Sequence, residues 1–508
     1  MKQKRLGQHS GLFSRRAEVV LVILILILCG TATAETDEIS SMRRLIAEQQ
    51  RQLEQQKKQI ESQSALLEKL LQQVSDIQSN LSAGGSLATT LKGEPANTTT
   101  AETTTLNTSL SVATPTPAAT KSTSSSQNPD KLTFRAYWKQ GLRFDTPDKA
   151  FQLKVGGRIM NDWGFFSPNT SVANTIGPLD DGTEFRRARL YVEGVLHKHV
   201  KFKAQYDFAG GDAGFKDMYI GLTKLPVVGN ITFGHMKEPF GLETLTSSKY
   251  ITFLERALPS TFAPERNTGI QVQNAVSGNR FTWALGAFRD ADAFGGSFGN
   301  GGYNYTGRVT TRPLYREKGR KVLHFGMAYR HGNPNGNSLR YRARPSAHLL
   351  PRFVNTGKFA ATSTDTLGVE FAVVSGPLSL QSEFTYSAAN RPAAIKEEFT
   401  SFYVQTSLFL TGEHRVYKSS AGAFDRVKPY RSFMPGDGAG KGAWEVAVRY
   451  ARINLNDSFI QGGELRDFTL GLNWYLNPNT RFMWNYGLAE RVGIGVANLL
   501  QTRFQVDF

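Results

Sequence analysis

Much of the chain alternates between apolar and polar residues with a period of two. In residues 201–208 apolar or aromatic side chains occupy every second position from Phe202 to Phe208, and polar side chains fill the rest. Residues 468–475 and 481–488 repeat the pattern. A β-strand with one apolar and one polar face has this period. Gly, Asn, Asp and Pro separate about sixteen such segments, so the pattern predicts an antiparallel all-β region.

Three details favour a membrane barrel over a soluble sandwich, which also alternates. Aromatic residues stand at the ends of the apolar faces, as a membrane interface requires. The gaps between segments alternate loosely between short and long. The chain ends with Phe504, Val506 and Phe508 on one face of a last strand. We therefore predict an all-β transmembrane barrel of about 16 antiparallel strands over residues 131–508.

Residues 39–81 follow a different pattern, a continuous heptad repeat. The a positions are Ile39, Ile46, Leu53, Ile60, Leu67, Val74 and Leu81, and the d positions are Met42, Gln49, Gln56, Gln63, Leu70 and Ile77. This spacing predicts an N-terminal α-helical coiled coil over residues 35–81, with a single amphipathic helix as the alternative. An even-stranded barrel has both ends in the periplasm, so the coiled coil is expected there, where it could contact the cell wall. Three barrels side by side would bring three helices together, so a homotrimer is expected.

Two further segments precede the barrel. Residues 1–34 combine basic residues, an apolar run from Val19 to Leu28 and the small residues Ala32-Thr33-Ala34, which is typical of a cleaved signal peptide. An uncleaved anchor is the alternative. Residues 82–130 are rich in Ser, Thr, Ala and Pro and predict a flexible linker.

Composition narrows the class of protein. A hydrophobic content of 40% and a mean hydropathy of −0.34 argue against a helical membrane protein. The single cysteine, Cys29, lies in the expected signal peptide, so a disulfide or a cysteine-ligated metal is not expected. The net charge is +17. Since an exported chain meets little nucleic acid, we expect small anions as partners, beside the lipid of the bacterial outer membrane.

The barrel region resembles the family of phosphate-selective porins O and P. The motifs that carry the resemblance are residues 151–158 (FQLKVGGR), 185–190 (FRRARL), 237–243 (KEPFGLE), 246–250 (TSSKY), 254–256 (LER), 411–413 (TGE) and 470–475 (LGLNWY). They are spread over residues 150–508. The resemblance implies a sixteen-stranded trimeric barrel, a constriction loop folded inward, and an anion path lined by arginine.

The first candidate site is the strand that contains Arg186, Arg187 and Arg189. Its apolar side chains place Arg187 and Arg189 on the lumen face, where guanidinium groups can bind oxyanions. Arg186 has the wrong phase, so we expect either a bulge, a strand that begins there, or a position above the membrane interface. Structural ion pairs with Glu193 and its neighbours are the alternative role for these arginines.

The second candidate site is residues 238–266, which break the alternation and match the constriction loop of the family. The resemblance implies that Ser248 and Lys249 contact the anion. A hydroxyl beside an ammonium group supplies a donor and a charge. A solvated surface lysine is the alternative for Lys249.

The third candidate site is a basic stretch from Arg308 to Arg352, with eleven Lys or Arg and one acid. Arg340, Arg342 and Arg344 alternate and can share one face of an extended chain, where they would attract anions. A solvated loop face is the alternative. Ser346, Ala347 and His348 follow where phosphate-specific members of the family continue an arginine ladder. Lys216 stands where those members carry an acid, so anion preference is expected more firmly than phosphate selectivity.

No pattern for catalysis, for a cofactor or for a metal site stands out, and we do not expect an enzyme. The sequence therefore predicts an outer-membrane porin for diffusive uptake of small anions, with phosphate or polyphosphate favoured. Two alternatives stay open. One is a general or sugar-permeable porin, and the other is a structural tether whose coiled coil bridges to the cell wall.

Overall fold

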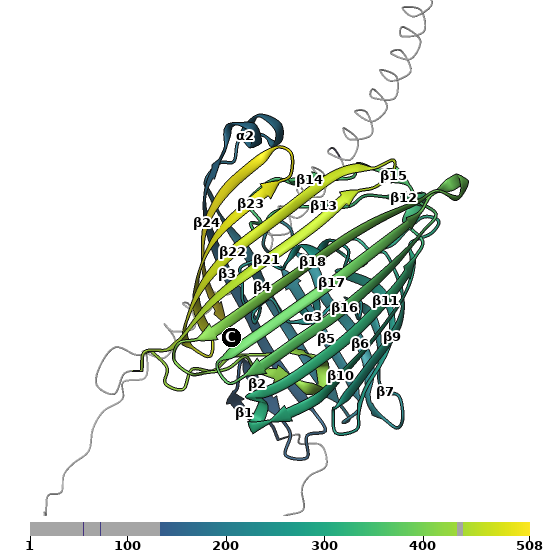
Figure 1. Cartoon of the computed structure of the whole chain (residues 1–508). Coiled ribbons are helices and arrows are strands. Elements are labelled where there is room, and N and C mark those ends of the chain that lie inside the picture. Colours follow the sequence, from purple (N-terminus) through teal and green to yellow (C-terminus); the bar gives the residue numbers. More distant parts are fainter. Residues whose placement is uncertain (1–53, 55–71, 73–132, 434–439) are drawn as a thin grey trace, which may run out of the picture. The chain divides into compact units, whose positions relative to one another are not determined.

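The computed structural model describes residues 54, 72, 133–433 and 440–508 (Figure 1). The chain divides into two compact units, Met1–Ser122 and Thr123–Phe508. Of the first unit only Glu54 and Gln72 are described, and both are helical. The predicted signal peptide, coiled coil and linker otherwise lie outside the described residues. The fold below is that of the second unit.

One antiparallel sheet of eighteen strands forms the wall, and sixteen of them close into a barrel. These sixteen are β3 (Gln152–Pro168), β4 (Gly182–Leu196), β5 (Val200–Asp207), β6 (Gly214–Leu225), β7 (Gly229–Lys237), β8 (Arg266–Val276), β9 (Phe281–Arg289), β10 (Tyr303–Arg316), β11 (Lys321–Gly332), β16 (Ser363–Ser375), β17 (Leu378–Asn390), β18 (Lys396–Phe409), β21 (Ala443–Asn456), β22 (Gln461–Asn477), β23 (Thr480–Arg491) and β24 (Gly495–Asp507). Each pairs with the next, and β24 pairs with β3 from Asp507↔Arg158 to Ala497↔Pro168. The predicted sixteen-stranded barrel is confirmed.

A hairpin of β1 (Arg135–Trp138) and β2 (Leu142–Asp145) extends the wall at the rim where the chain ends. Strand β2 pairs with residues 152–155 of β3, just beyond the last contact of β24 with the same strand. Phe508 completes the junction, since its backbone N–H and C=O both bond to Gly157. We call this end of the barrel the C-terminal rim.

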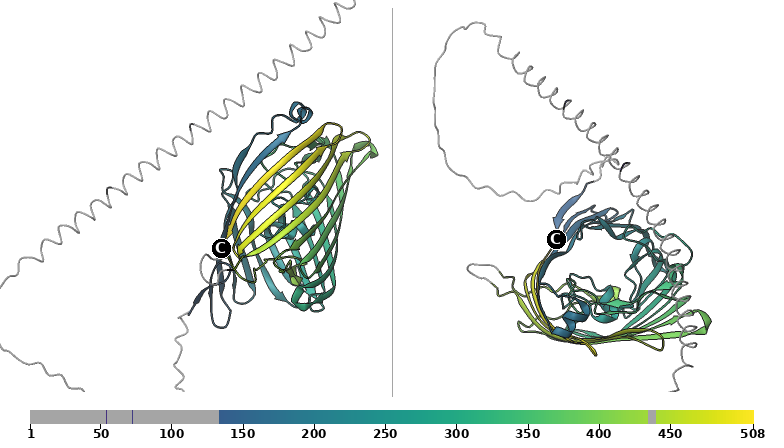
Figure 2. Two further views of the ribbon diagram at one scale, coloured as in Figure 1. Left: turned by 60° about the vertical axis from the view of Figure 1, so that its left-hand side comes forward. Right: turned by 90° about the horizontal axis from the view of Figure 1, so that it is seen from above.

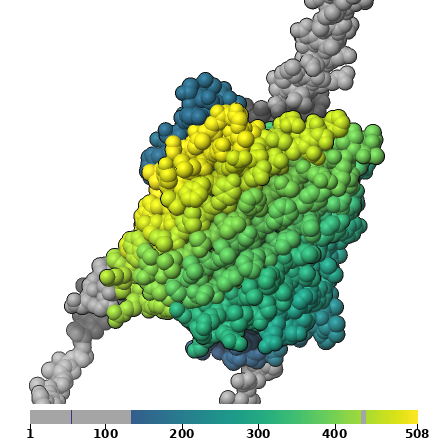
Figure 3. Space-filling model, in the orientation of Figure 1, coloured from purple at the N-terminus to yellow at the C-terminus, as the bar shows by residue number. Residues whose placement is uncertain are grey.

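The two faces of the wall differ as the alternation predicts. Outward side chains are apolar and exposed, for example Leu190 at 50% and Ile220 at 63%. Inward side chains such as Gln205, Asn473 and Arg503 are polar and buried. Figure 3 shows the outer wall over the green and yellow strands as a continuous surface. An apolar exterior with a polar interior is the arrangement of a barrel that spans a lipid bilayer.

The constriction loop, residues 238–265 between β7 and β8, turns into the lumen. It contains α3 (Leu242–Leu245) and the short 3₁₀ helix η2 (Leu258–Thr261). Seen along the barrel, Figure 2 shows segments inside the ring of strands. Leu242, Phe253 and Leu254 are fully buried there. The predicted inward loop is present.

A second segment also enters the lumen, and the sequence pattern did not predict it. Residues 410–433, the return segment, leave β18 at the C-terminal rim and carry β19 (Tyr417–Lys418), η6 (Ser419–Ala421) and β20 (Ala423–Phe424). Tyr417 and Phe424 pack against Leu242 of the constriction loop. The backbone N–H of Phe424 also donates to Thr246 Oγ1 at 3.3 Å. Loop and segment therefore meet inside the barrel.

The other described elements are short. They are α2 (Thr170–Ile176), η3 (Glu317–Gly319), η4 (Asn335–Asn337), β12 (Ser338–Leu339), β13 (Arg342–Ala343), β14 (Val354–Asn355), β15 (Phe359–Ala360) and η5 (Pro392–Ala394). Residues 333–362 form the longest connection at the rim opposite to the C-terminal one. Among the described helices, none combines the length and the apolar character that a membrane span requires.

Candidate functional site

Strand β4 carries a bulge at Arg186. Met160 of β3 pairs with Arg187, and the next residue, Asn161, pairs with Phe185, so Arg186 is the extra residue. A bulge turns the side chain of the extra residue away from the regular alternation. Arg186 therefore reaches the lumen, where it donates to both carboxylate oxygens of Glu255 at 2.9 and 3.0 Å. The bulge that the sequence offered as one explanation of its phase is confirmed.

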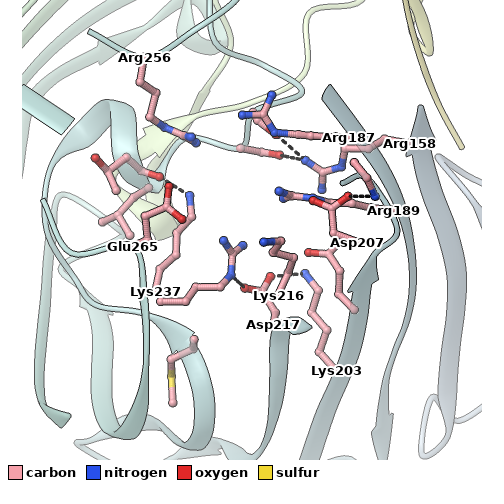
Figure 4. A pocket seen from close by; sticks show the side chains of 18 of the residues that line it. Arg158, Arg187, Arg189, Lys203, Asp207, Lys216, Asp217, Lys237, Arg256 and Glu265 are labelled. Atoms are coloured by element: carbon pink, nitrogen blue, oxygen red, sulfur yellow. Dashed lines mark hydrogen bonds and ion pairs between the residues drawn. The ribbon is translucent and has the colours of Figure 1, made fainter. Parts of the chain in front are cut away.

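A cavity of about 640 Å³ lies between the wall and the constriction loop (Figure 4). Its lining includes ten basic side chains: Arg158, Arg186, Arg187, Arg189, Lys201, Lys203, Lys216, Lys237, Arg256 and Arg266. It includes five acidic ones: Glu184, Asp207, Asp217, Glu255 and Glu265. In Figure 4 the labelled side chains surround an open centre and come from both the wall and the loop. The lining has an excess of positive charge.

Part of this charge is neutralised within the wall. Arg189 donates to Asp207 at 2.7 Å. Lys203 lies 3.0 Å and Arg266 2.7 Å from the carboxylate of Asp217. The alternative role of the arginines, structural ion pairing, thus applies to all three: Arg186 and Arg187 pair with Glu255, and Arg189 pairs with Asp207. Within the described residues, none of them pairs with Glu193.

Five of the ten cations have no carboxylate within 4 Å among the described residues. They are Arg158, Lys201, Lys216, Lys237 and Arg256. Of the five acidic side chains in the lining, only Glu265 has no ion-pair partner within the described part of the chain. Arg256 instead donates to the backbone carbonyls of Glu243 and Thr246, both at 2.9 Å. A buried cation without a counter-ion is costly, so these groups favour an anion in the cavity.

Arg158 shows this need directly, and Arg187, which lies 3.8 Å from Glu255, has a buried donor free among the described residues as well. Arg158 Nη1 donates to Ser248 Oγ at 2.8 Å, which places a guanidinium and a hydroxyl side by side. The Nε of Arg158 and the Nε of Arg187 are buried and have no hydrogen-bond partner in the part of the chain that the structure describes. Donors of this kind can bind the oxygens of an anion.

The predicted pair Ser248 and Lys249 is divided. Ser248 lines the cavity, whereas Lys249 lies against the wall, 8% exposed, with Nζ 3.4 Å from Asp507. Burial, and after it the guanidinium of Arg158, lowers the pKa of Lys249 to about 7. Lys249 therefore does not line the cavity.

Arg340, Arg342 and Arg344 lie in the long connection at the opposite rim and do not line this cavity. Arg340 and Arg342 are exposed and Arg344 is half-buried, whereas Tyr341 is half-buried and Ala343 is buried. Arg340 Nε donates to Asn355 at 2.9 Å, and Arg344 Nη1 donates to the carbonyl of His348 at 2.6 Å. Of this connection, His348 alone reaches the cavity lining.

Several lining residues were not among the candidates. Lys201 and Lys203 stand on the polar face of residues 201–208, so the period of two could have assigned them to the lumen. Lys237 and Arg256 lie within motifs of the family resemblance. Arg158 ends the motif at residues 151–158. The signals were present in each case, but which of these cations gain a carboxylate partner is decided by contacts between distant segments.

A closed antiparallel barrel with an apolar exterior, a charged lumen and an inward loop is the architecture of a porin. The family model of phosphate-selective porin O and P matches residues 153–508. The chain belongs to this family, which makes it a channel protein of the outer membrane. Family and fold point to a channel rather than an enzyme.

Two related proteins illustrate the similarity. Porin O of Pseudomonas aeruginosa is 28% identical over 395 residues, which cover 69% of this chain and 86% of that protein. An uncharacterised protein of Caulobacter vibrioides is 29% identical over 369 residues, covering 70% of this chain and 72% of the relative.

Similar solved structures include an anion-selective porin from Comamonas acidovorans, at 13% identity and a TM-score of 0.45, covering 70% of this chain and 100% of that one. Another is the outer membrane channel DcaP of Acinetobacter baumannii, at 10% identity and a TM-score of 0.43, covering 72% and 99%.

Proposed function

We propose that the protein is a porin for diffusive uptake of small anions. The carrying observation is the set of five lining cations without a carboxylate partner in the described residues: Arg158, Lys201, Lys216, Lys237 and Arg256. In a lumen with low-dielectric walls, their field raises the local concentration of anions and repels cations. The ion-paired remainder of the lining, such as Arg189 with Asp207, keeps the wall rigid without adding net charge.

We propose phosphate or polyphosphate as the favoured anion. Arg158, whose Nε has no partner among the described residues, stands next to Ser248, so a guanidinium and a hydroxyl converge on one place in the cavity. Phosphate oxygens suit such a combination of charged and neutral donors. The family description, phosphate-selective porin O and P, supports the same choice. Exposed Arg340 and Arg342 at the opposite rim would increase the rate of anion entry.

A second candidate is a general porin that also passes neutral solutes. A second cavity of about 440 Å³ shares Leu245, Gln271 and Gln273 with the first. Amide and hydroxyl groups such as Asn230, Thr282 and Ser420 line it, and no carboxylate of the described residues does. The cations there are Arg308 and Lys418, and Arg308 is paired with Glu370. Apart from Lys418, this stretch is lined by uncharged groups and one ion-paired cation, which favours passage of uncharged molecules as well.

For the whole chain we propose an outer-membrane homotrimer. Residues 35–81 would form a periplasmic coiled coil after cleavage of residues 1–34, and residues 82–130 would link it to the barrel. The heptad repeat over residues 39–81 and the signal-peptide pattern support this organisation. Contact of the coiled coil with the cell wall remains part of the proposal.

The test is electrical. We would measure the reversal potential of the purified protein in a planar bilayer under a potassium chloride gradient, and then add phosphate. The proposal predicts an anion-selective potential and a chloride current that phosphate blocks. A potential near zero without block would leave the general porin. A cation-selective potential would contradict the anion pathway altogether.

A further inference from the structure

Residues 251–255 of the constriction loop run along the inner face of the last four strands. Each of these strands supplies one side-chain donor to a different backbone carbonyl of the loop. The bonds are Arg481 Nη1 to Ile251 at 2.9 Å, Asn473 Nδ2 to Thr252 at 2.9 Å, Arg503 Nη1 to Leu254 at 2.5 Å, and Arg449 Nη1 to Glu255 at 3.0 Å. Side chains of the wall thus replace the strand pairing that this stretch lacks.

The three arginines of this group are among the largest fully buried side chains of the described residues. Arg503 donates to the carboxylate of Asp162 through Nε and through Nη2, each at 2.6 Å, and Nη2 also donates to Glu255 at 2.9 Å. Arg449 also donates to Ser346 Oγ at 2.7 Å. Removing an oxygen partner from a buried guanidinium leaves a charge without compensation, which opposes displacement of the loop.

Arg481 depends most on the loop. Among the described residues it has no carboxylate within 4 Å, and its oxygen partners are Ile251 O, Tyr475 Oη at 3.2 Å and Gln505 Oε1 at 3.1 Å. The backbone carbonyl of Ile251 is therefore one of three dipoles that compensate a fully buried positive charge.

The near end of the loop is fixed separately. Glu383 of β17 accepts the backbone N–H groups of Leu242 and Glu243 at 2.7 and 2.8 Å, which are the first residues of α3. Glu243 in turn accepts the N–H of Ala257 at 2.8 Å. The stretch in between, which carries Ser248, is held by the four donors of β21–β24. Further bonds come from Gln505 to the carbonyl of Lys249 at 3.2 Å and from Arg186 to the carboxylate of Glu255.

We propose that Arg449, Asn473, Arg481 and Arg503 are positioning residues that set the bore and selectivity of the channel. None of them lines the 640 Å³ cavity. Of the residues they hold, Glu255 lines it, and so do Ser248 before residue 251 and Arg256 after residue 255. The inference rests on the proposed anion function for what the loop presents, whereas the clamping of the loop is independent of the ion.

The test uses Arg481→Met and Arg481→Lys in the full chain, with single-channel recording. Loss of a charge-assisted hydrogen bond shifts an equilibrium by about tenfold or more, so partial closures should occur about tenfold more often in both variants. Arg481→Lys keeps the charge, which separates positioning from electrostatics. The matched control is Arg452→Gln on β21, which is 40% exposed and pairs with Glu464. Its frequency of partial closures should equal that of the parent protein.

A disulfide provides the rescue. The described residues contain no cysteine, so Thr252→Cys with Asn473→Cys introduces the only pair in the barrel. In the Arg481→Met background, formation of the disulfide should lower the frequency of partial closures to that of the parent protein. Its reduction should raise the frequency again. Folded Arg481 variants with unchanged closures, or a formed disulfide without rescue, would overturn the clamp. If the Arg481 variants close more often and the disulfide rescues them, but the channel shows no anion preference, only the proposed function is refuted.

Discussion

At the scale of single residues, Arg158 combines the properties expected of an anion ligand. It is 6% exposed, it bonds Ser248, its Nε has no partner among the described residues, and no carboxylate there neutralises it. Arg189 and Lys203, by contrast, form ion pairs with the wall carboxylates Asp207 and Asp217, which neutralise their charge. Equal counts of lumen cations can therefore have unequal effects, because only the uncompensated ones present a net field to the solute.

The first prediction concerns Arg158→Gln. The substitution keeps a donor but removes the charge, so phosphate should block the chloride current about tenfold less well, or ~1.4 kcal/mol. Titration of the single-channel current with phosphate measures this. Arg452→Gln, which removes an outward arginine, serves as control. A block of unchanged affinity in Arg158→Gln would exclude this residue as a phosphate ligand.

The second prediction concerns the pH dependence caused by Lys249. Its pKa of about 7 means that the side chain is charged below pH 7 and neutral above it. Anion selectivity in potassium chloride should decline as pH rises from 6 to 8, and Lys249→Met should lose this titration. In the unfolded chain the lysine keeps its proton to a pKa near 10.4, so the contribution of this group to stability rises between pH 7 and pH 10. Reversal potentials at three pH values suffice. A Lys249→Met channel that titrates like the parent would contradict the assignment.

At the scale of elements, the return segment is as much part of the lumen as the constriction loop. Arg308 of β10 binds Glu370 through two bonds at 2.8 and 2.7 Å and also donates to the carbonyl of Gly422. The hydroxyl of Tyr417 lies 2.7 Å from His324 Nδ1, whose ring is fully buried. These contacts hold the segment inside the barrel, beside the 440 Å³ cavity that it helps to line.

The third prediction is that Tyr417→Phe loosens the return segment. The lost hydroxyl leaves a buried ring nitrogen unpaired, which should lower the free energy of unfolding by about 1–3 kcal/mol. The unit conductance should rise, because the segment narrows the lumen. Urea unfolding in lipid and single-channel recording measure the two effects. The control Tyr305→Phe, at an exposed outward position, should change neither quantity. Unchanged stability and conductance in Tyr417→Phe would mean that the hydroxyl does not hold the segment.

The strands could be predicted from the sequence, and the lumen segments only in part. Alternation identifies a barrel strand because every second side chain meets lipid, and the off-phase Arg186 even indicated its bulge. Residues 410–433 have no such period, and they are held by partners such as Arg308 that lie far away in the chain. The direction of Lys249 was missed for the same reason, since a loop side chain has no phase to fix it.

At the scale of the whole molecule, all described contacts of the two cavities come from residues 158–423. The lumen chemistry is thus contained in the second compact unit. Residues 35–81 are expected to serve another purpose, such as contact with the cell wall.

The fourth prediction is that deletion of residues 39–81 leaves conductance and selectivity unchanged. The same deletion should abolish binding of the protein to purified cell-wall sacculi. Planar-bilayer recording and co-sedimentation with sacculi test the two halves separately. An altered reversal potential would show that the N-terminal region influences the pore, and undiminished sedimentation would place the wall contact elsewhere.

The junction of β3 with β24 has a consequence for the order of assembly. It joins the first and last strands of the cylinder, and its ion pair of Asp162 with Arg503 spans 341 residues. Contacts of such long sequence separation are expected late in folding. Arg503 also binds Leu254 and Glu255, so the constriction loop gains these partners only when the seam forms. During folding, the constriction loop would therefore reach its final position in the same step in which the sheet closes into a barrel.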